Sequence, residues 1–173
     1  MSDGSPTDAP SGDPPAAAHD PADLPWPADD AWIVNGPLGP PGSWGRPGVI
    51  LAFHLECAGC VGRAVPFLKR LLREHEGRFQ PVLLHTAYGH RPRPQAHVVP
   101  EATRFLTSFA RLDWPTAIDA DGSVAQAWGA EGTPHWFVHD ADGRRVRDLY
   151  GSQENATTRL AYLMDELLGP EGR

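Results

Sequence analysis

The sequence has no long apolar run, and its first thirty residues carry no positive charge. No stretch approaches the roughly 20 apolar residues that a membrane-spanning helix needs. Residues 1–30 lack the basic and apolar segments of a secretory signal, so we expect a cytoplasmic protein without membrane contact. Seven of the 22 acidic residues lie there, which leaves 15 acidic and 15 basic residues in the rest of the chain. This balance argues against nucleic acid as a partner.

Cysteine is scarce, because the chain contains only Cys57 and Cys60. Structural disulfides are rare in the cytoplasm, and a spacing of three points to redox chemistry or metal binding. A structural zinc site needs four ligands. The chain has no second CxxC motif, although His54, His85 and His90 are candidates to complete a Cys2His2 site. Because the ligand spacing of a zinc site is missing, redox chemistry is favoured. We expect no metal and no cofactor.

The composition divides the chain into a tail and one domain. Residues 1–30 are acidic and low in complexity, with seven Pro. Such a segment buries too little apolar surface to offset the entropy of ordering, so we expect a disordered tail. Residues 31–173 are enough for one domain with a real core, and we expect it to be a monomer.

The first half of this domain has the pattern of a βαβ unit. Val49–Phe53 and Pro81–His85 are continuous apolar runs, which is typical of strands buried on both faces. Between them, apolar residues recur at spacings of three and four over residues 60–75, which predicts a helix. Pro66 either kinks this helix or marks its true beginning. We expect the two strands to be parallel with a right-handed crossover.

The second half predicts further strands and helices. Residues 88–99 are expected to form a long loop, and Pro100 to open a helix that ends near Arg111. Asp142-Gly143 indicates a hairpin turn. The remaining expected elements are strands over 116–119, 135–139 and 145–150 and helices over 123–128 and 154–168. Together these elements predict an α/β fold, with a central mixed sheet flanked by helices.

The two cysteines lie just after the first buried strand and at the start of the predicted helix. That edge of an open α/β sheet is where chemistry is usually placed. The free N–H groups and positive partial charge of a helix N-terminus favour a thiolate, which is the nucleophile. We therefore expect Cys57, nearer the strand end, to attack a substrate disulfide. Cys60 then resolves the mixed disulfide.

The turn Gly132-Thr133-Pro134 directly precedes an apolar strand, where a proline removes a hydrogen-bond donor. Two interpretations fit. The Thr133–Pro134 bond is cis and the turn faces the cysteines, or Pro134 is an ordinary trans proline at a strand start.

Charged and titratable neighbours surround Cys57 in the sequence. Glu56 is expected either to raise the thiol pKa by repulsion and accept a proton when Cys60 attacks, or to be a solvated surface residue. His54 and His135 are candidates to stabilise the thiolate when protonated, and His85 ends the neighbouring strand at the same edge.

In order and spacing these features resemble the thioredoxin superfamily, on its TlpA/ResA-like branch of thiol–disulfide oxidoreductases. The residues that carry the resemblance are Val49–Phe53, Cys57, Cys60, Arg63, Pro66-Phe67-Leu68, Ala125, Trp128-Gly129, Gly132-Thr133-Pro134, Phe137-Val138 and Asp142-Gly143. The resemblance implies a thioredoxin-like fold, a cis Pro134 packed against the disulfide, and the same roles for the two cysteines. The chain departs from this branch before the first cysteine, where it has His54-Leu55-Glu56, and between the cysteines, where it lacks the usual Pro.

We therefore expect an enzyme that reduces disulfides in proteins or small molecules and is itself reduced by a reductant protein. One alternative is a peroxide-reducing antioxidant protein of related fold. The P-x-x-x-T/S-x-x-C pattern of peroxiredoxins is missing, however, because positions 50 and 54 are Ile and His. The other alternative is a non-enzymatic, metal-binding domain of thioredoxin-like fold.

Overall fold

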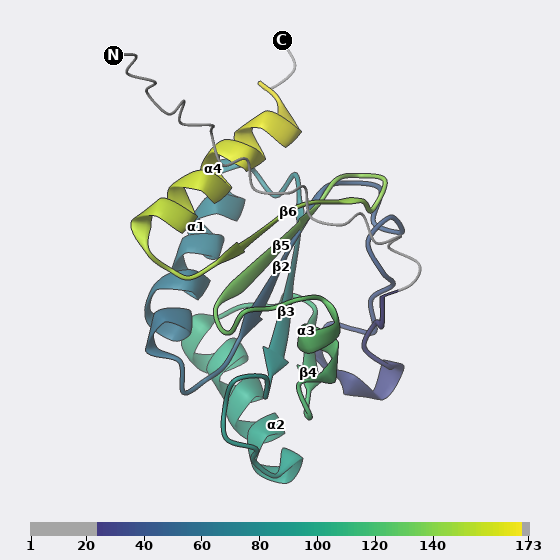
Figure 1. Ribbon diagram of the computed structural model, residues 1–173, viewed down its shortest axis with the longest axis vertical. Helices are drawn as coiled ribbons and strands as arrows, with labels where there is room; N and C mark the ends of the chain where they lie inside the picture. Colours follow the sequence, from purple (N-terminus) through teal and green to yellow (C-terminus); the bar gives the residue numbers. More distant parts are fainter. Residues whose placement is uncertain (1–23, 171–173) are drawn as a thin grey trace, which may run out of the picture.

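A six-stranded β-sheet forms the centre of the structure, a computed structural model that describes residues 24–170 (Figure 1). The strands lie in the order β1–β4–β3–β2–β5–β6. β2, β3 and β4 are parallel, whereas β1, β5 and β6 run antiparallel to their neighbours, so the sheet is mixed as predicted. The strands span Trp32–Val34 (β1), Gly48–Phe53 (β2), Gln80–Thr86 (β3), Thr116–Asp119 (β4), His135–His139 (β5) and Arg145–Tyr150 (β6).

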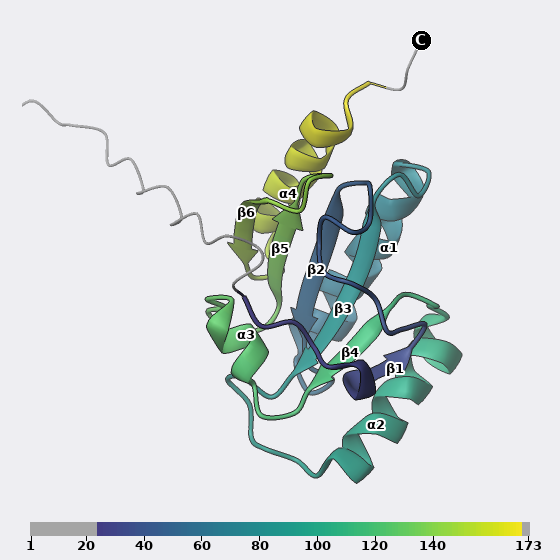
Figure 2. The same ribbon diagram turned by 90° about the vertical axis from the view of Figure 1, so that its right-hand side faces the viewer.

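Helices and an extended segment cover the two faces of this sheet. α1 (Val65–Glu74), α2 (Gln95–Arg104) and α4 (Glu154–Leu168) lie on one face (Figures 1 and 2). α3 (Ser123–Ala127) and residues 24–44, which include the short helix η2 (Asp29–Ala31), lie on the other face. Within residues 24–170, no helix has the length and apolar character to cross a membrane.

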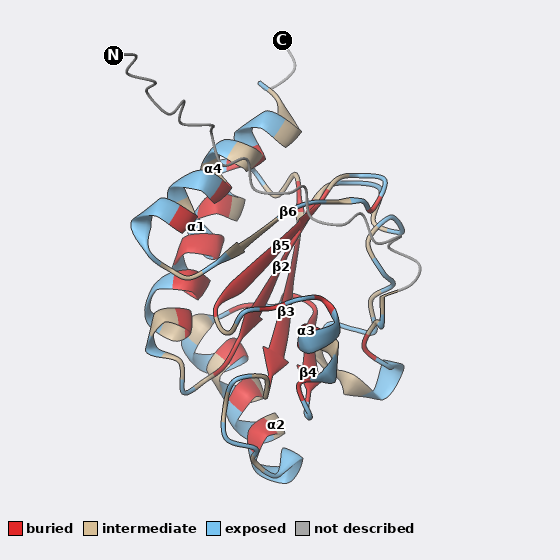
Figure 3. Ribbon diagram, viewed as in Figure 1, coloured by how far each residue is buried: buried red, intermediate tan, exposed pale blue. Residues whose placement is uncertain are grey.

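Strand β2 shows the consequence of covering both faces. All six of its residues are buried, as the red central strands of Figure 3 show. Leu51 and Phe53 belong to the core under α1 and α4, while Ile50 and Ala52 belong to the core under α3. Because neither face meets water, the strand has no polar alternation, and its continuous apolar run predicted it correctly.

The helix predicted over residues 60–75 has two parts. It begins as a π-helical segment, η3 (Cys60–Ala64), and continues as α1 from Val65. Pro66 is the second residue of α1 and follows the π-helical segment without a break, so the proline lies where the hydrogen-bonding pattern changes from π to α. Pro66 therefore marks the start of the α-helical part, whereas the helix as a whole begins before it.

The elements predicted after residue 112 are confirmed. β4, α3, the β5–β6 hairpin and α4 all fall where the apolar patterns placed them, within a residue or two. The hairpin turns at Asp142-Gly143, and Gly143 has a φ of 85°, a conformation that favours glycine.

The prediction for residues 88–99 is wrong in its second half. α2 begins at Gln95, directly after Pro94, and contains Pro100 instead of starting with it. A π-helical segment, η4 (Phe105–Ala110), then continues the helix. Burial of Val98 and Ala102 against the β4 edge stabilises the early turns. This burial outweighs the hydrogen bond lost at Pro100, which is exposed.

Residues 24–30 differ from the prediction of a disordered tail through residue 30. Trp26 stacks on Trp128 with ring centroids 5.6 Å apart. Its Nε1 donates to the carbonyl of Leu38 at 2.7 Å, and Trp128 donates to the carbonyl of Pro25 at 2.8 Å. The composition of this segment offers little apolar surface to bury, but the one ring of Trp26 supplies enough to hold it against the domain. The rest of the predicted tail, residues 1–23, lies outside the described residues.

Candidate active site

Cys57 and Cys60 form a disulfide at the carboxyl end of β2. Cys57 caps the helix that follows: its carbonyl accepts from the N–H of Cys60 at 3.0 Å, and its Sγ accepts from the same N–H at 3.2 Å. Cys57 is partly exposed, whereas Cys60 is completely buried. A substrate can therefore reach only the first sulfur. This difference agrees with the roles expected from the sequence.

The Gly132-Thr133-Pro134 turn lies beside the disulfide, because β5 pairs with β2 in the sheet. The Thr133–Pro134 peptide bond is cis. Cys57 Sγ is 3.5 Å from the carbonyl oxygen of Thr133, and the carbonyl of Pro134 accepts from the N–H of Gly151 at 2.8 Å. The structure therefore brings together four residues that the sequence proposed for the site: both cysteines, Thr133 and Pro134.

Three histidines, His54, His85 and His90, pack against one another next to the loop that carries Cys57, and we call them the histidine stack. The rings of His54 and His90 lie flat on each other, with centroids 3.9 Å apart and planes at 8°. His85 is tilted against His54, with ring centroids 4.6 Å apart and planes at 35°. His90 Nε2 is 2.6 Å from the hydroxyl of Thr133. The stack therefore reaches the Gly132-Thr133-Pro134 turn, which we call the proline turn.

Burial keeps these histidines neutral at pH 7. Burial, and then the proximity of His90, lowers the pKa of His54 to about 4. Burial, and then His54, lowers the pKa of His85 to about 4, and burial also lowers the pKa of His90. With the cysteine pair oxidised, the buried His54 ring is therefore neutral. That a protonated His54 stabilises the thiolate of the reduced form stays a prediction.

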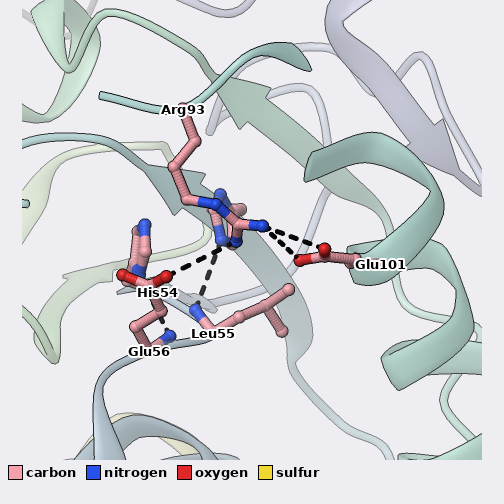
Figure 4. Close-up of polar contacts among 6 residues, drawn as sticks. His54, Leu55, Glu56, Arg93 and Glu101 are labelled. Atoms are coloured by element: carbon pink, nitrogen blue, oxygen red, sulfur yellow. Dashed lines mark hydrogen bonds and ion pairs between the residues drawn. The ribbon is translucent and has the colours of Figure 1, made fainter. Parts of the chain in front are cut away.

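Glu56 is partly neutralised by an arginine from the loop after β3. Its carboxylate is 3.7 Å from Arg93, which also binds Glu101 of α2 at 2.8 Å (Figure 4). Glu56 is exposed, and Arg93 offsets its charge. The structure thus places Glu56 at the rim of the site, next to Cys57 in the chain and paired with a cation.

His135, the fourth histidine considered, does not join the stack. Its ring packs on Phe137, on the α3 side of the sheet, with centroids 4.6 Å apart. Its Nδ1 accepts from the N–H of Glu131 at 3.2 Å, and its Nε2 faces Asp148 at 3.4 Å. These partners anchor it in the β5–β6 hairpin.

His90 and Arg93 are the site residues that the sequence did not assign to the redox chemistry. Both lie after β3, which ends at the same sheet edge as β2, and this shared edge is the signal that could have indicated them. Within residues 24–170, no group of three or more His, Cys, Asp or Glu side chains has the geometry to hold a metal ion.

Comparisons with known proteins give structural but not sequence relatives. No family model matches the chain, and no curated protein is significantly similar to it. A thiol-disulfide isomerase from Corynebacterium glutamicum superimposes with a TM-score of 0.65 at 23% identity, over 88% of this chain and 99% of that one. A secreted disulfide oxidoreductase from Mycobacterium tuberculosis gives 0.50 at 18% identity, over 71% and 83%. StoA from Bacillus subtilis gives 0.50 at 15% identity, over 68% and 81%.

These structures share one architecture with the chain, and at such identities the likeness concerns the fold. It agrees with the mixed sheet and the helices that flank it. The resemblance stated from the sequence is thus confirmed at the level of the fold: the chain has a thioredoxin-like fold.

Proposed function

We propose that the chain is a thiol–disulfide oxidoreductase in which Cys57 exchanges disulfides with a substrate. The observation that carries this proposal is the position of the Cys57 sulfur. It is accessible, it accepts the N–H of Cys60 at a helix N-terminus, and it is bonded to a second, buried sulfur. A thiolate at Cys57 would keep this hydrogen bond and the favourable end of the helix dipole.

The reaction follows from the exposure of the two sulfurs. The Cys57 thiolate attacks one sulfur of a substrate disulfide, that bond breaks, and the departing sulfur leaves as a thiolate that takes up a proton. The buried Cys60 then loses its proton and attacks Cys57 Sγ, which releases the second substrate thiol. Two electrons pass to the substrate, and Cys57–Cys60 is left oxidised. A dithiol reductant, which we propose to be a protein, returns the pair to its thiol form.

The first experiment measures whether the pair is a reversible couple. The full chain is equilibrated in glutathione buffers of graded ratio, and the thiols of Cys57 and Cys60 are counted by alkylation and mass spectrometry. We expect one cooperative two-electron transition. A protein that stays oxidised or stays reduced across the whole range would contradict the proposal.

The second experiment assigns the roles of the cysteines. The Cys60→Ser variant should form a stable mixed disulfide with an oxidised protein such as insulin, and dithiothreitol should release it. Cys57→Ser is the matched control, because its remaining thiol is buried and should trap nothing. Equal trapping by the two variants would show that exposure does not set the order of attack.

We propose the reducing direction for the reaction, with the protein acting in the cytoplasm. The relevant measurement is the redox state of the pair in growing cells, trapped by acid and alkylation. A mostly reduced Cys57–Cys60 pair supports this direction, and a mostly oxidised pair indicates an oxidant in another compartment.

A further inference from the structure

We propose that the histidine stack is a positioning element of the active site, in which His54 and His85 hold the segment Leu55–Cys57 and His90 holds the proline turn. As far as reactivity is concerned, this inference rests on the proposed function. None of the three rings is assigned a direct role in electron transfer. They act through the backbone that carries the nucleophile.

The first observation is a pair of hydrogen bonds from the segment that leads to Cys57. The N–H of Leu55 donates to Nε2 of His85 at 3.3 Å, and the N–H of Glu56 donates to Nδ1 of His54 at 3.1 Å (Figure 4). Two consecutive N–H groups are thus bound by imidazoles from β3 and from the end of β2. The segment leaves the sheet at this point, where the strand ladder no longer offers acceptors.

The two bonds require opposite tautomers. An imidazole nitrogen that accepts must carry no proton, so His54 is protonated on Nε2 and His85 on Nδ1. Both rings must also be neutral. In an imidazolium both nitrogens are donors, and each would then face a backbone N–H.

The second observation links this segment to the turn on the other side of the sulfur. The His90 ring lies flat on the His54 ring, and its Nε2 contacts the Thr133 hydroxyl at 2.6 Å. The carbonyl of the same Thr133 is 3.5 Å from Cys57 Sγ. The stack therefore connects the two sides of the nucleophile by contacts that do not pass through the disulfide.

Charged groups around the stack come from several elements. Glu56 lies on the Cys57 segment, Arg93 on the loop after β3, Glu101 on α2 and Asp119 at the end of β4. Arg93 pairs with both Glu56 and Glu101, which weakens the attraction of these carboxylates for a proton on the rings. Asp119 is engaged by the Thr86 hydroxyl and by the first N–H groups of α3. We therefore expect the stack to stay neutral in the range where thiol exchange operates.

Matched substitutions separate the acceptor from the bulk of the ring. Asn places an oxygen near the position of Nδ1, and Gln places one near Nε2, so His54→Asn and His85→Gln keep the hydrogen bonds. His54→Leu and His85→Leu fill similar space without an acceptor. The readouts are the rate constant of reduced Cys57 with a small aromatic disulfide and the equilibrium constant of the pair with glutathione.

We expect each Leu variant to react about fivefold or more slowly, since one hydrogen bond of ordinary strength is worth about that factor. Its glutathione equilibrium constant should change by a similar factor. The Asn and Gln variants should stay within about twofold of the wild type in both readouts. Leu variants that match the wild type, or Asn and Gln variants as impaired as the Leu variants, would overturn the inference.

A spectroscopic measurement tests the same arrangement without relying on activity. In the full ¹⁵N-labelled protein at pH 7, long-range ¹H–¹⁵N spectra should show His54 as the Nε2–H tautomer and His85 as the Nδ1–H tautomer. Identical tautomers, or a charged ring at pH 7, would overturn the positioning role. A wild-type protein with no glutathione couple would instead overturn the proposed function, and the tautomers would still decide whether the stack binds the segment.

Discussion

The buried histidine at the far end of β5 gives a prediction about acid stability that is independent of the active site. His139 is 5% exposed and packs edge-on against Trp44. Burial, and then the charge of Arg145, lowers the pKa of His139 from 6.5 to about 4, although Asp140 opposes the shift. Between these two pKa values the unfolded chain binds a proton that the folded chain does not. The free energy of unfolding therefore falls as the pH drops through this range.

The magnitude follows from the width of the pKa interval. Each pH unit within it costs about 1.4 kcal/mol, and the loss between pH 7 and pH 5 amounts to about 2 kcal/mol. His139→Phe and His139→Gln both remove the titrating group but change packing differently. In urea unfolding, each variant should lose about 2 kcal/mol less than the wild type between pH 7 and pH 5, because packing effects are present at both pH values. If both variants lose as much stability as the wild type, the buried neutral histidine does not contribute to acid sensitivity.

Two further predictions concern residues that hold the fold together. Asp119→Ala removes a buried carboxylate that accepts from one hydroxyl and two N–H groups, and urea unfolding should show a loss of about 3 kcal/mol. The control Asp121→Ala removes an exposed carboxylate that accepts from one N–H, and it should cost clearly less. Equal losses in the two variants would contradict the capping role of Asp119. Trp26→Ala removes the ring stacked on Trp128 and should cost about 2 kcal/mol, whereas exposed Tyr162→Ala should change stability by less than about 0.5 kcal/mol. A Trp26→Ala variant as stable as the wild type would mean that residues 24–30 are not part of the folded unit.

The sequence predicted the central sheet because each strand there is long enough for its pattern of apolar residues to indicate how it is buried. All of β2 and residues 81–84 of β3 are buried and form uninterrupted apolar or small runs. The β5–β6 hairpin was marked by Asp142-Gly143, where a positive φ is needed. In these regions local propensity and tertiary environment agree.

The errors come from places where tertiary contacts outweigh local signals. Pro100 indicated a helix start, but Pro94 six residues earlier already provides one, and burial of Val98 and Ala102 extends the helix across Pro100. Trp26 lies in a segment whose composition predicts disorder, yet its one ring finds Trp128 about a hundred residues away. A local pattern cannot anticipate a partner at that distance.

The active site shows the same division between what is local and what is not. The CxxC pair and its helix are adjacent in sequence and were predicted. The histidine stack joins His54, after β2, to His85 and His90, about thirty residues later, and the sequence grouped these residues only as candidate metal ligands.

The sequence suggested that a charged histidine stabilises a Cys57 thiolate, and the structure points to a different group. With the cysteine pair oxidised, burial lowers the pKa of His54 to about 4, so at pH 7 its ring is neutral and its Nδ1 accepts the N–H of Glu56. The backbone N–H of Cys60 already lies 3.2 Å from the Cys57 sulfur, and it can donate to a thiolate without any side chain being protonated. The helix terminus therefore supplies the favourable electrostatics, and the neutral histidines are left to fix where the sulfur lies. The same residue type that suggested a charge effect in the sequence acts in the structure as a hydrogen-bond acceptor.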